Sequence, residues 1–220
     1  MPDSLVLYSN PMSRGRIARW MLEEIGTPYR TEVIGYGPAM KSAEFLTINP
    51  MGKVPAIRHG TTIVTECAAI CAYLADAFPE ADLAPPLASR GAYYRWLFFA
   101  AGPLEAAVTD RDLGMEPNIE QQARVGYGSI ETVLETLEQA VSVSEYIAGA
   151  HFSAADVYLG SHIGWGMQFG SWSHAPLSST TGSASVTARP IGAPTGSTIR
   201  PWLPSRNIRQ PDGSRSLSGS

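Results

Sequence analysis

Residues 49–55 read Asn-Pro-Met-Gly-Lys-Val-Pro and lead into the short apolar run Ala56-Ile57. A residue that precedes proline can adopt a cis peptide bond, and Val54 would then present its own backbone N–H and C=O to a ligand. Taken alone, the stretch is equally consistent with an ordinary proline-bounded loop that enters an edge strand. The elements on either side of it are therefore needed to choose between the two.

These neighbouring elements follow the order strand, helix, strand, short helix, two-stranded hairpin and helix. Ser13 is placed to cap the first helix and Gly26 to end it, and His59-Gly60 is a hairpin turn signal. We expect these elements at residues 5–8, 14–25, 29–34, 41–46, 54–57, 61–64 and 68–77. A proline-rich linker at residues 79–86 precedes three helical patterns, at residues 89–114, 118–141 and 154–169. The sequence thus predicts an α/β part followed by an all-α part.

The composition excludes several classes of protein. The chain has 220 residues, 44% apolar and 16% charged, with a net charge of −4, so it can form a core but lacks the basic balance of a nucleic-acid-binding protein. The only cysteines, Cys67 and Cys71, cannot build a disulfide framework, which favours a reducing, cytoplasmic setting. The most apolar window, residues 97–108, is interrupted by Gly102 and Pro103, and no secretory leader opens the chain. We expect a soluble protein that binds neither nucleic acid nor a membrane.

Residues 65–70 read Thr-Glu-Cys-Ala-Ala-Ile and place polar groups where a helix begins. The unpaired N–H groups and positive dipole end of a helix favour a carboxylate ligand. Capping by Thr65, with Glu66 offsetting the dipole, explains the same residues without a ligand. Cys67 and Cys71 lie one helical turn apart with no further metal-ligating residue at suitable spacing, so we expect buried thiols and no metal site.

Two hydroxyl side chains are candidates for activating a thiol. Ser13, at the N-terminus of a helix, can donate a hydrogen bond to a thiolate that the helix dipole also stabilises. Tyr8 lies in the strand before that helix. The alternatives are that Ser13 only caps the helix and that Tyr8 is a buried strand aromatic.

Taken together and in order, these motifs resemble the glutathione transferase family, in its theta-like or bacterial classes. The resemblance covers residues 4–170 and rests on residues 7–14, 19–24 and 49–55, on Glu66, Ala69-Ile70 and Tyr73-Leu74, and on a capping box at residues 153–156. It implies a thioredoxin-like, glutathione-binding α/β domain at residues 1–78, a linker at 79–88 and an all-α domain at 89–170 that completes a hydrophobic-substrate site.

The resemblance also implies roles for individual residues in binding glutathione. Val54, before Pro55, would hydrogen-bond the cysteinyl backbone of glutathione, Glu66 and Cys67 would hold its γ-glutamyl end, and Lys53 would face its glycyl carboxylate. The family usually has serine where this chain has Cys67, and a thiol is the weaker hydrogen-bond donor.

For thiol activation, Ser13 matches the serine of the theta-like classes and Tyr8 the tyrosine of the alpha and mu classes. We prefer Ser13 because the helix N-terminus adds to its effect. Tyr93, Tyr94 and Trp96 are candidates for the wall of the hydrophobic-substrate site.

The implied reaction is conjugation of the glutathione thiolate to a small hydrophobic electrophile, for detoxification. It uses glutathione as co-substrate, with no prosthetic group and no metal, in a cytoplasmic homodimer. Glutathione-dependent reductase or isomerase chemistry is an alternative that a cysteine at the activating position would support, but that position is Ser13. A non-catalytic, glutathione-binding interaction protein is a third hypothesis, favoured by Cys67 and by the unusual end of the chain.

Residues 171–220 differ sharply from the rest. Of these 50 residues, 28 are Ser, Thr, Pro or Gly, and their net charge is +4 against −8 for residues 1–170. Such a composition predicts an irregular or disordered tail. Codons read from the third base of each codon for residues 172–190 allow Tyr-Trp and Asp-Arg-Pro-Ala runs, which the family has in this region. We therefore predict a frameshift near residues 170–172, and not a natural low-complexity extension, with an uncovered flank on the helix at 154–169 and little activity.

Overall fold

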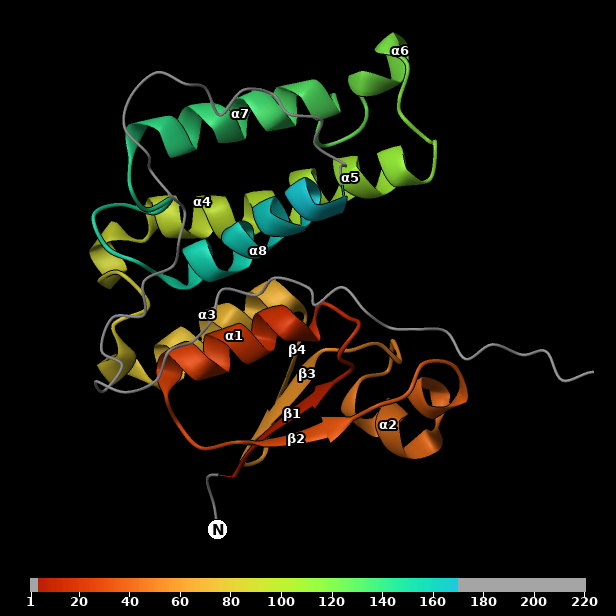
Figure 1. Cartoon of the computed structure of the whole chain (residues 1–220), viewed down its shortest axis with the longest axis vertical. Helices are drawn as coiled ribbons and strands as arrows, with labels where there is room; N and C mark the ends of the chain where they lie inside the picture. The colour runs from red at the N-terminus through yellow and green to blue at the C-terminus, as the bar shows by residue number, and fades with distance from the viewer. Residues whose placement is uncertain (1–3, 170–220) are drawn as a thin grey trace, which may run out of the picture. The chain divides into compact units, whose positions relative to one another are not determined.

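The computed structural model describes residues 4–169. A four-stranded mixed sheet with the order β2-β1-β3-β4 forms the centre of the N-terminal part (Figure 1). β1 (Leu5–Ser9) pairs parallel with β2 (Arg30–Val33) and antiparallel with β3 (Ala56–His59), which pairs antiparallel with β4 (Thr62–Thr65). The expectations for residues 171–220, a frameshift and an irregular tail that leaves a flank uncovered, lie outside the described residues and stay predictions.

Alternation along β1 assigns each face of the sheet to different helices. Leu5 and Leu7 are buried with α1 (Gly15–Ile25) and α3 (Cys67–Ala77) on one face. Side chains of the intervening residues, Val6 and Tyr8, are buried with the 3-10 turn η1 (Pro38–Lys41) and α2 (Ala43–Ile48) on the other. Helices on both faces of a βαβ-α-ββ-α chain make this part thioredoxin-like, as predicted (Figure 1).

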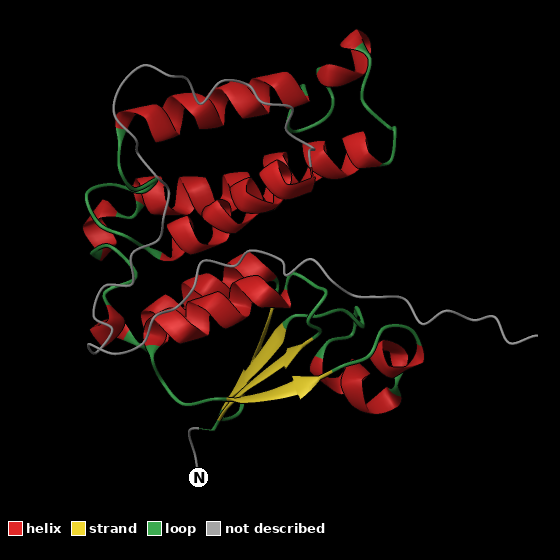
Figure 2. Cartoon of the chain, in the orientation of Figure 1, coloured by secondary structure: helices red, strands yellow, loops and turns green. Residues whose placement is uncertain are grey.

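The remainder of the described chain is helical (Figure 2). Short 3-10 turns, η2 (Pro79–Ala81) and η3 (Leu87–Ser89), lead to α4 (Gly91–Phe99), the π turn η4 (Ala100–Leu104), α5 (Glu105–Asp112), α6 (Ile119–Gln122), α7 (Ile130–Val143) and α8 (Ala154–Phe169). Pro103 lies inside η4 and has no N–H to give the helical ladder, which explains why the expected helix at 89–114 is interrupted there.

The prediction of a single helix at residues 118–141 is wrong, because two helices, α6 and α7, occupy this region. Asn118 caps α6 and Ser129 caps α7, and the chain turns between them, where Gly128 has a φ of 70° that favours glycine. The short helix expected at residues 41–46 is also displaced, because Ser42 accepts a hydrogen bond from the backbone of Phe45 and so starts α2 two residues later than expected.

Helix α8 joins the two parts of the described chain, because it packs against α1, α3 and α4. Its first turn is fixed by Asp156, whose Oδ2 accepts hydrogen bonds from the N–H of Ser153 at 2.9 Å and from its Oγ at 2.8 Å. The other oxygen, Oδ1, accepts from the N–H of Ile147 at 2.7 Å. The predicted capping residues thus hold both the helix and the loop before it.

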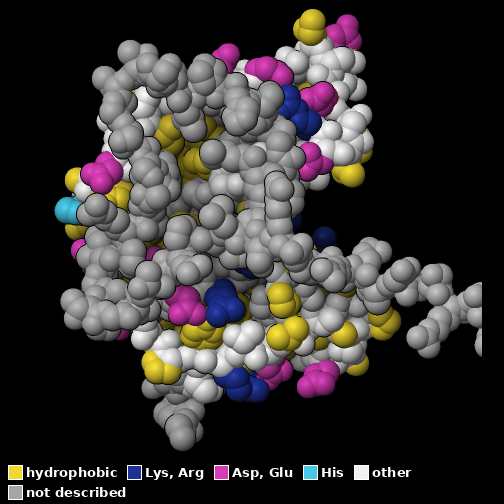
Figure 3. Space-filling view, viewed as in Figure 1, with side chains coloured by type: hydrophobic (Ala, Val, Ile, Leu, Met, Phe, Trp, Pro, Cys, Tyr) yellow, Lys and Arg dark blue, Asp and Glu magenta, His cyan; other side chains and the backbone are white. Residues whose placement is uncertain are grey.

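Acidic and basic side chains meet at several places on the visible face, and other acidic side chains stand apart (Figure 3). Arg30 contacts Glu32 at 2.6 Å and Arg111 contacts Glu116 at 3.2 Å. Within residues 4–169, none of the helices is both long and apolar enough to cross a membrane. The same residues contain no group of three side chains that could hold a metal ion.

Candidate active site at one edge of the sheet

The strand directions bring the predicted site residues to the same edge of the sheet. Tyr8 of β1 pairs with Ala56 of β3, and Ala56 pairs with Thr65 of β4. Because β3 runs antiparallel to both neighbours, the end of β1, the start of β3 and the end of β4 coincide. The loops that carry Ser13, residues 53–55 and residues 66–67 therefore leave the sheet together.

Asn10 organises the loop that carries Ser13. Its Oδ1 accepts from the N–H of Met12 at 2.9 Å, and its Nδ2 donates to the carbonyl of Ile34 at 2.9 Å. The Asn10 carbonyl accepts from the N–H of Ser13 at 3.0 Å and from the Ser13 Oγ at 2.7 Å. Ser13 Oγ in turn accepts from the N–H of Gly15 at 3.0 Å. The N-cap residue of α1 is Arg14 and not Ser13 as predicted, and Ser13, one residue earlier, accepts from the first N–H of the helix. The Ser13 hydroxyl proton must turn away from Asn10 to reach a thiolate.

Tyr8 has a different environment. Its side chain is 6% exposed and packs beside Phe45, with 6.1 Å between the ring centroids, in the cluster on the α2 face of the sheet. Its hydroxyl makes no hydrogen bond with the described residues. This placement is that of a strand aromatic in the core, and the choice of Ser13 over Tyr8 as the activating hydroxyl stays a prediction.

The loop at residues 49–55 is held by Asn49, which is buried. Asn49 Nδ2 donates to the carbonyl of Lys53 at 2.7 Å, and Asn49 Oδ1 accepts from the N–H of Met51 at 3.0 Å. The Val54–Pro55 bond is cis, as the sequence allows. Neither the N–H nor the C=O of Val54 is hydrogen-bonded within residues 4–169, so both are available to a ligand.

Sequence reasoning missed Lys41 as part of this edge. Lys41 Nζ donates to the carbonyl of Met51 at 2.8 Å, which places a second ammonium group at the loop that carries Lys53. Lys53 itself is exposed, and its ammonium makes no contact with the described residues. The only signal was a basic residue at the start of an expected helix, which is common on solvated surfaces. Two lysines at one loop favour binding of a carboxylate.

Glu66 has a backbone conformation that is unusual for a residue other than glycine, with φ 65° and ψ 119°. Such conformations cost about 1–3 kcal/mol and cluster at functional sites. Its carboxylate is exposed and without a partner in the described part of the chain, and α3 begins with no side-chain cap. The capping explanation of residues 65–70 is therefore wrong, and the first N–H groups of α3 are free for a ligand.

Both cysteines are buried free thiols, as predicted. The Cys67 thiol points toward α1 and donates to the carbonyl of Arg14 at 3.6 Å. A hydrogen bond with Cys67 and burial together hold the pKa of Cys71 well above its ordinary value. The Cys71 thiol is therefore not set up as a nucleophile.

Comparison with known proteins agrees with this geometry. A family profile described as glutathione S-transferase, N-terminal domain, matches residues 12–77. The chain is 30% identical to glutathione S-transferase GstA of Escherichia coli O157:H7 over 56% of the chain and 61% of that protein. It is also 30% identical to glutathione S-transferase 3 of Zea mays over 69% of the chain and 73% of that protein. The chain belongs to the glutathione S-transferase family.

The solved structures lead to the same family. A sphingomonad glutathione S-transferase complexed with glutathione superposes with a TM-score of 0.59 and 28% identity, over 75% of this chain and 84% of that one. The chain spans 61% of the length of the Escherichia coli relative.

In this glutathione S-transferase family member, the three predicted substrate-wall residues differ in exposure. Tyr93 and Trp96 are 1% and 5% exposed and pack in the core, whereas Tyr94 is 43% exposed. The Tyr93 hydroxyl has no hydrogen-bond partner in the described chain, and burial raises its pKa. Of these three residues, only Tyr94 exposes enough of its side chain to contact a substrate.

A salt-bridged junction links the Ser13 loop to the helical part. Arg14 Nη2 contacts Glu105 Oε1 at the start of α5, and Nδ1 of His162 in α8 lies 3.6 Å from Glu105 Oε2. Burial lowers the pKa of His162 to about 4, and nearby Glu105 opposes that shift only in part. The imidazole is therefore neutral near pH 7.

This lowered pKa predicts a specific loss of stability in acid. Unfolded histidine has a pKa of about 6.5, so between pH 6.5 and 4 the unfolded chain binds more protons than the folded one. Stability contributed by the neutral imidazole is complete above pH 6.5 and falls with pH. Between pH 7 and pH 5 we expect the wild type to lose about 2 kcal/mol more unfolding free energy than His162→Leu. Urea titrations at both pH values measure this difference, and equal losses would contradict it.

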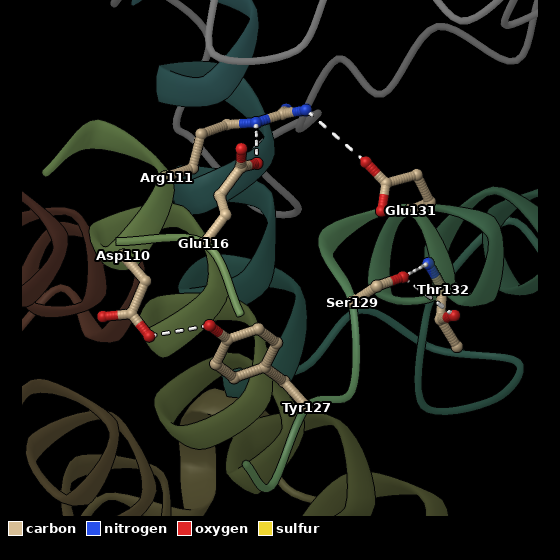
Figure 4. Close-up of polar contacts among 7 residues, drawn as sticks. All are labelled: Asp110, Arg111, Glu116, Tyr127, Ser129, Glu131 and Thr132. Carbon is tan, nitrogen blue, oxygen red and sulfur yellow. Dashed lines mark hydrogen bonds and ion pairs between the residues drawn. The ribbon is translucent and has the colours of Figure 1, made fainter. Parts of the chain in front are cut away.

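Figure 4 shows a second polar cluster, on α5, α7 and the chain between them. Tyr127, Ser129 and Glu131 of this cluster also line a pocket of about 140 Å³. Tyr127 donates to Asp110 at 2.7 Å, and Arg111 contacts both Glu116 and Glu131. Burial and the Asp110 contact raise the pKa of Tyr127 to about 12. The contacts connect the loop between these helices to α5, which gives the cluster a structural role.

Proposed function

We propose that this chain conjugates the thiolate of glutathione to electrophilic carbon. The observation that carries the proposal is the shared edge itself. Because Ala56 pairs with Thr65, the loop with the free N–H and C=O of Val54 and the loop with the unpartnered carboxylate of Glu66 leave the sheet at the same edge. An extended peptide needs backbone partners, which Val54 offers. An α-amino group needs an acceptor, for which Glu66 is suited. The solved relative complexed with glutathione supports this ligand.

The proposed residue roles follow from the charges of glutathione. Glu66 takes the γ-glutamyl ammonium, and the N–H groups at Cys67 take its carboxylate. Lys53, aided by Lys41, faces the glycyl carboxylate. Val54, before Pro55, pairs with the cysteinyl backbone, which directs the thiol toward Ser13.

The protein contributes to the reaction by lowering the pKa of the glutathione thiol, which is mostly protonated at neutral pH when free. Ser13 Oγ donates a hydrogen bond to the sulfur, and the N-terminus of α1 adds positive potential. The thiol proton passes to solvent. The thiolate forms a C–S bond to the electrophile as the leaving group departs with its electron pair.

We also propose a hydrophobic electrophile and a homodimer, as the family resemblance implies. Tyr94 is the exposed member of the expected substrate wall. Light scattering during size-exclusion chromatography tests the dimer, and a monomer at micromolar concentration would contradict it.

The proposal is tested by calorimetry with glutathione and by conjugation to a nitroaryl halide. Glu66→Gln should weaken glutathione binding about tenfold, because a charge-assisted hydrogen bond is lost. Glu80→Gln is the matched control, since Glu80 is also exposed but lies in η2. Binding without conjugation would leave only an interaction protein. No binding, or equal effects of the two variants, would contradict the proposed site.

A further inference from the structure

The chain that follows β2 is tied by hydrogen bonds to the loop between β1 and α1. The N–H of Ile34 donates to the carbonyl of Ser9 at 2.8 Å, and Asn10 Nδ2 donates to the carbonyl of Ile34 at 2.9 Å. Two residues further on, the hydroxyl of Tyr36 donates to the carbonyl of Met12 at 3.1 Å. The roles proposed above for binding glutathione and activating its thiol do not use Tyr36.

The Tyr36 contact holds a peptide unit that belongs in part to Ser13. The carbonyl of Met12 and the N–H of Ser13 lie in one planar peptide unit. Its carbonyl end accepts from Tyr36 at 3.1 Å, and its N–H end donates to the carbonyl of Asn10 at 3.0 Å. The two contacts together resist rotation of this plane. Because the plane leads directly into the Ser13 Cα, its orientation decides where the Ser13 side chain points.

We infer that Tyr36 is a positioning residue for thiol activation, acting through the Met12–Ser13 peptide unit on the Ser13 hydroxyl. This inference rests on the proposed function. A donor at the carbonyl end of a peptide also polarises it and strengthens the hydrogen bond at its N–H end, here to Asn10. Without the Tyr36 hydroxyl, the Met12 carbonyl can turn toward solvent. Ser13 Oγ then lies within reach of the thiolate in a smaller fraction of the molecules.

The exposure of Tyr36 allows this role to be separated from folding. Tyr36 is 59% exposed, so removing its hydroxyl leaves the core packing unchanged, whereas Asn10, which holds the same loop, is buried. Tyr29 offers a matched control, because its hydroxyl donates to Glu23 Oε1 at 2.7 Å in an equally exposed hydrogen bond. Tyr29 precedes β2 and Tyr36 follows it, so Tyr29 lies at the edge of the sheet opposite to the proposed site.

The test compares Tyr36→Phe with Tyr29→Phe, each of which keeps the ring and loses the hydroxyl. We measure the pKa of bound glutathione from its ultraviolet thiolate absorbance, its affinity by calorimetry, and kcat/KM against pH. Tyr36→Phe should raise the thiol pKa by about half a unit, which is about a threefold loss of kcat/KM well below that pKa and none above it. Glutathione affinity should be unchanged, because the proposed binding groups lie on other loops. Tyr29→Phe should match the wild type in all three quantities.

A Ser13→Ala background completes the test. If Tyr36 acts through Ser13, Tyr36→Phe has no further effect on the thiol pKa there. A further rise would mean that the Tyr36 hydroxyl reaches the sulfur itself, and it overturns the inference. An unchanged thiol pKa in Tyr36→Phe, an equal loss of kcat/KM at every pH, or the same shift in Tyr29→Phe also overturns it. A wild type that fails to lower the thiol pKa overturns the proposed function instead.

Discussion

Replacing Ser13 by alanine should lower the rate of conjugation about 10²-fold, the scale expected for losing one donor to a developing or stabilised anion. Glutathione affinity should change little, because its proposed binding groups are Lys53, Val54 and Glu66. The thiol pKa of bound glutathione should rise in parallel with the loss of rate. Calorimetry, thiolate absorbance and steady-state kinetics on one preparation measure all three quantities.

Two controls separate catalysis from folding. Ser13 Oγ also accepts from the N–H of Gly15, so the alanine variant should lose about 1 kcal/mol of stability with this hydrogen bond, which denaturation measures independently. Tyr8→Phe removes a hydroxyl from the buried cluster on the α2 face and should leave the thiol pKa unchanged. A larger rate loss in Tyr8→Phe than in Ser13→Ala would show that the tyrosine activates the thiol.

Much of the fold could be predicted because its signals are local. The continuous apolar run of β1 and the apolar residues of α1 and α3 extend over several residues, and Gly26 ends α1 in the left-handed conformation expected of it. The predicted starts of helices were wrong where a single capping side chain decides where the helix begins, as at Ser42 of α2 and Ser129 of α7. Such caps look the same in sequence as any surface serine.

The candidate site was partly predictable for a different reason. Val54 and Glu66 stand in short motifs at strand ends, and the topology of the sheet brings strand ends together. Lys41 and Tyr36 carry no such signal, because their partners lie ten residues away in a loop and 24 residues away in another loop. Side chains placed by tertiary packing cannot be found from sequence spacing alone. Tyr93 is the opposite case, a residue predicted for the substrate site that is buried in the core. An aromatic side chain on a helix fits either place equally well.

Gly52→Ala should be the most disruptive substitution of one small residue for another in the proposed glutathione site. Gly52 has a φ of 57°, and a Cβ there would lie 2.5 Å from the carbonyl oxygen of Met40. That oxygen belongs to the backbone and cannot move without shifting η1 or the loop that carries Lys53 and Val54. We expect a loss of about 3–4 kcal/mol of stability, from left-handed strain and the clash together.

The matched control is Gly26→Ala, at the end of α1. Gly26 has a similar φ of 71°, but a Cβ there meets no atom within 4 Å. This variant should lose only the left-handed penalty of about 1–2 kcal/mol and bind glutathione as the wild type does. Gly52→Ala should bind glutathione at least about tenfold more weakly. A displaced Lys53–Val54 backbone needs to cost only about 1.4 kcal/mol of binding free energy to lower the affinity by that factor. Equal stability losses would mean that the Met40 contact relaxes freely, and unchanged glutathione binding in Gly52→Ala would remove this loop from the site.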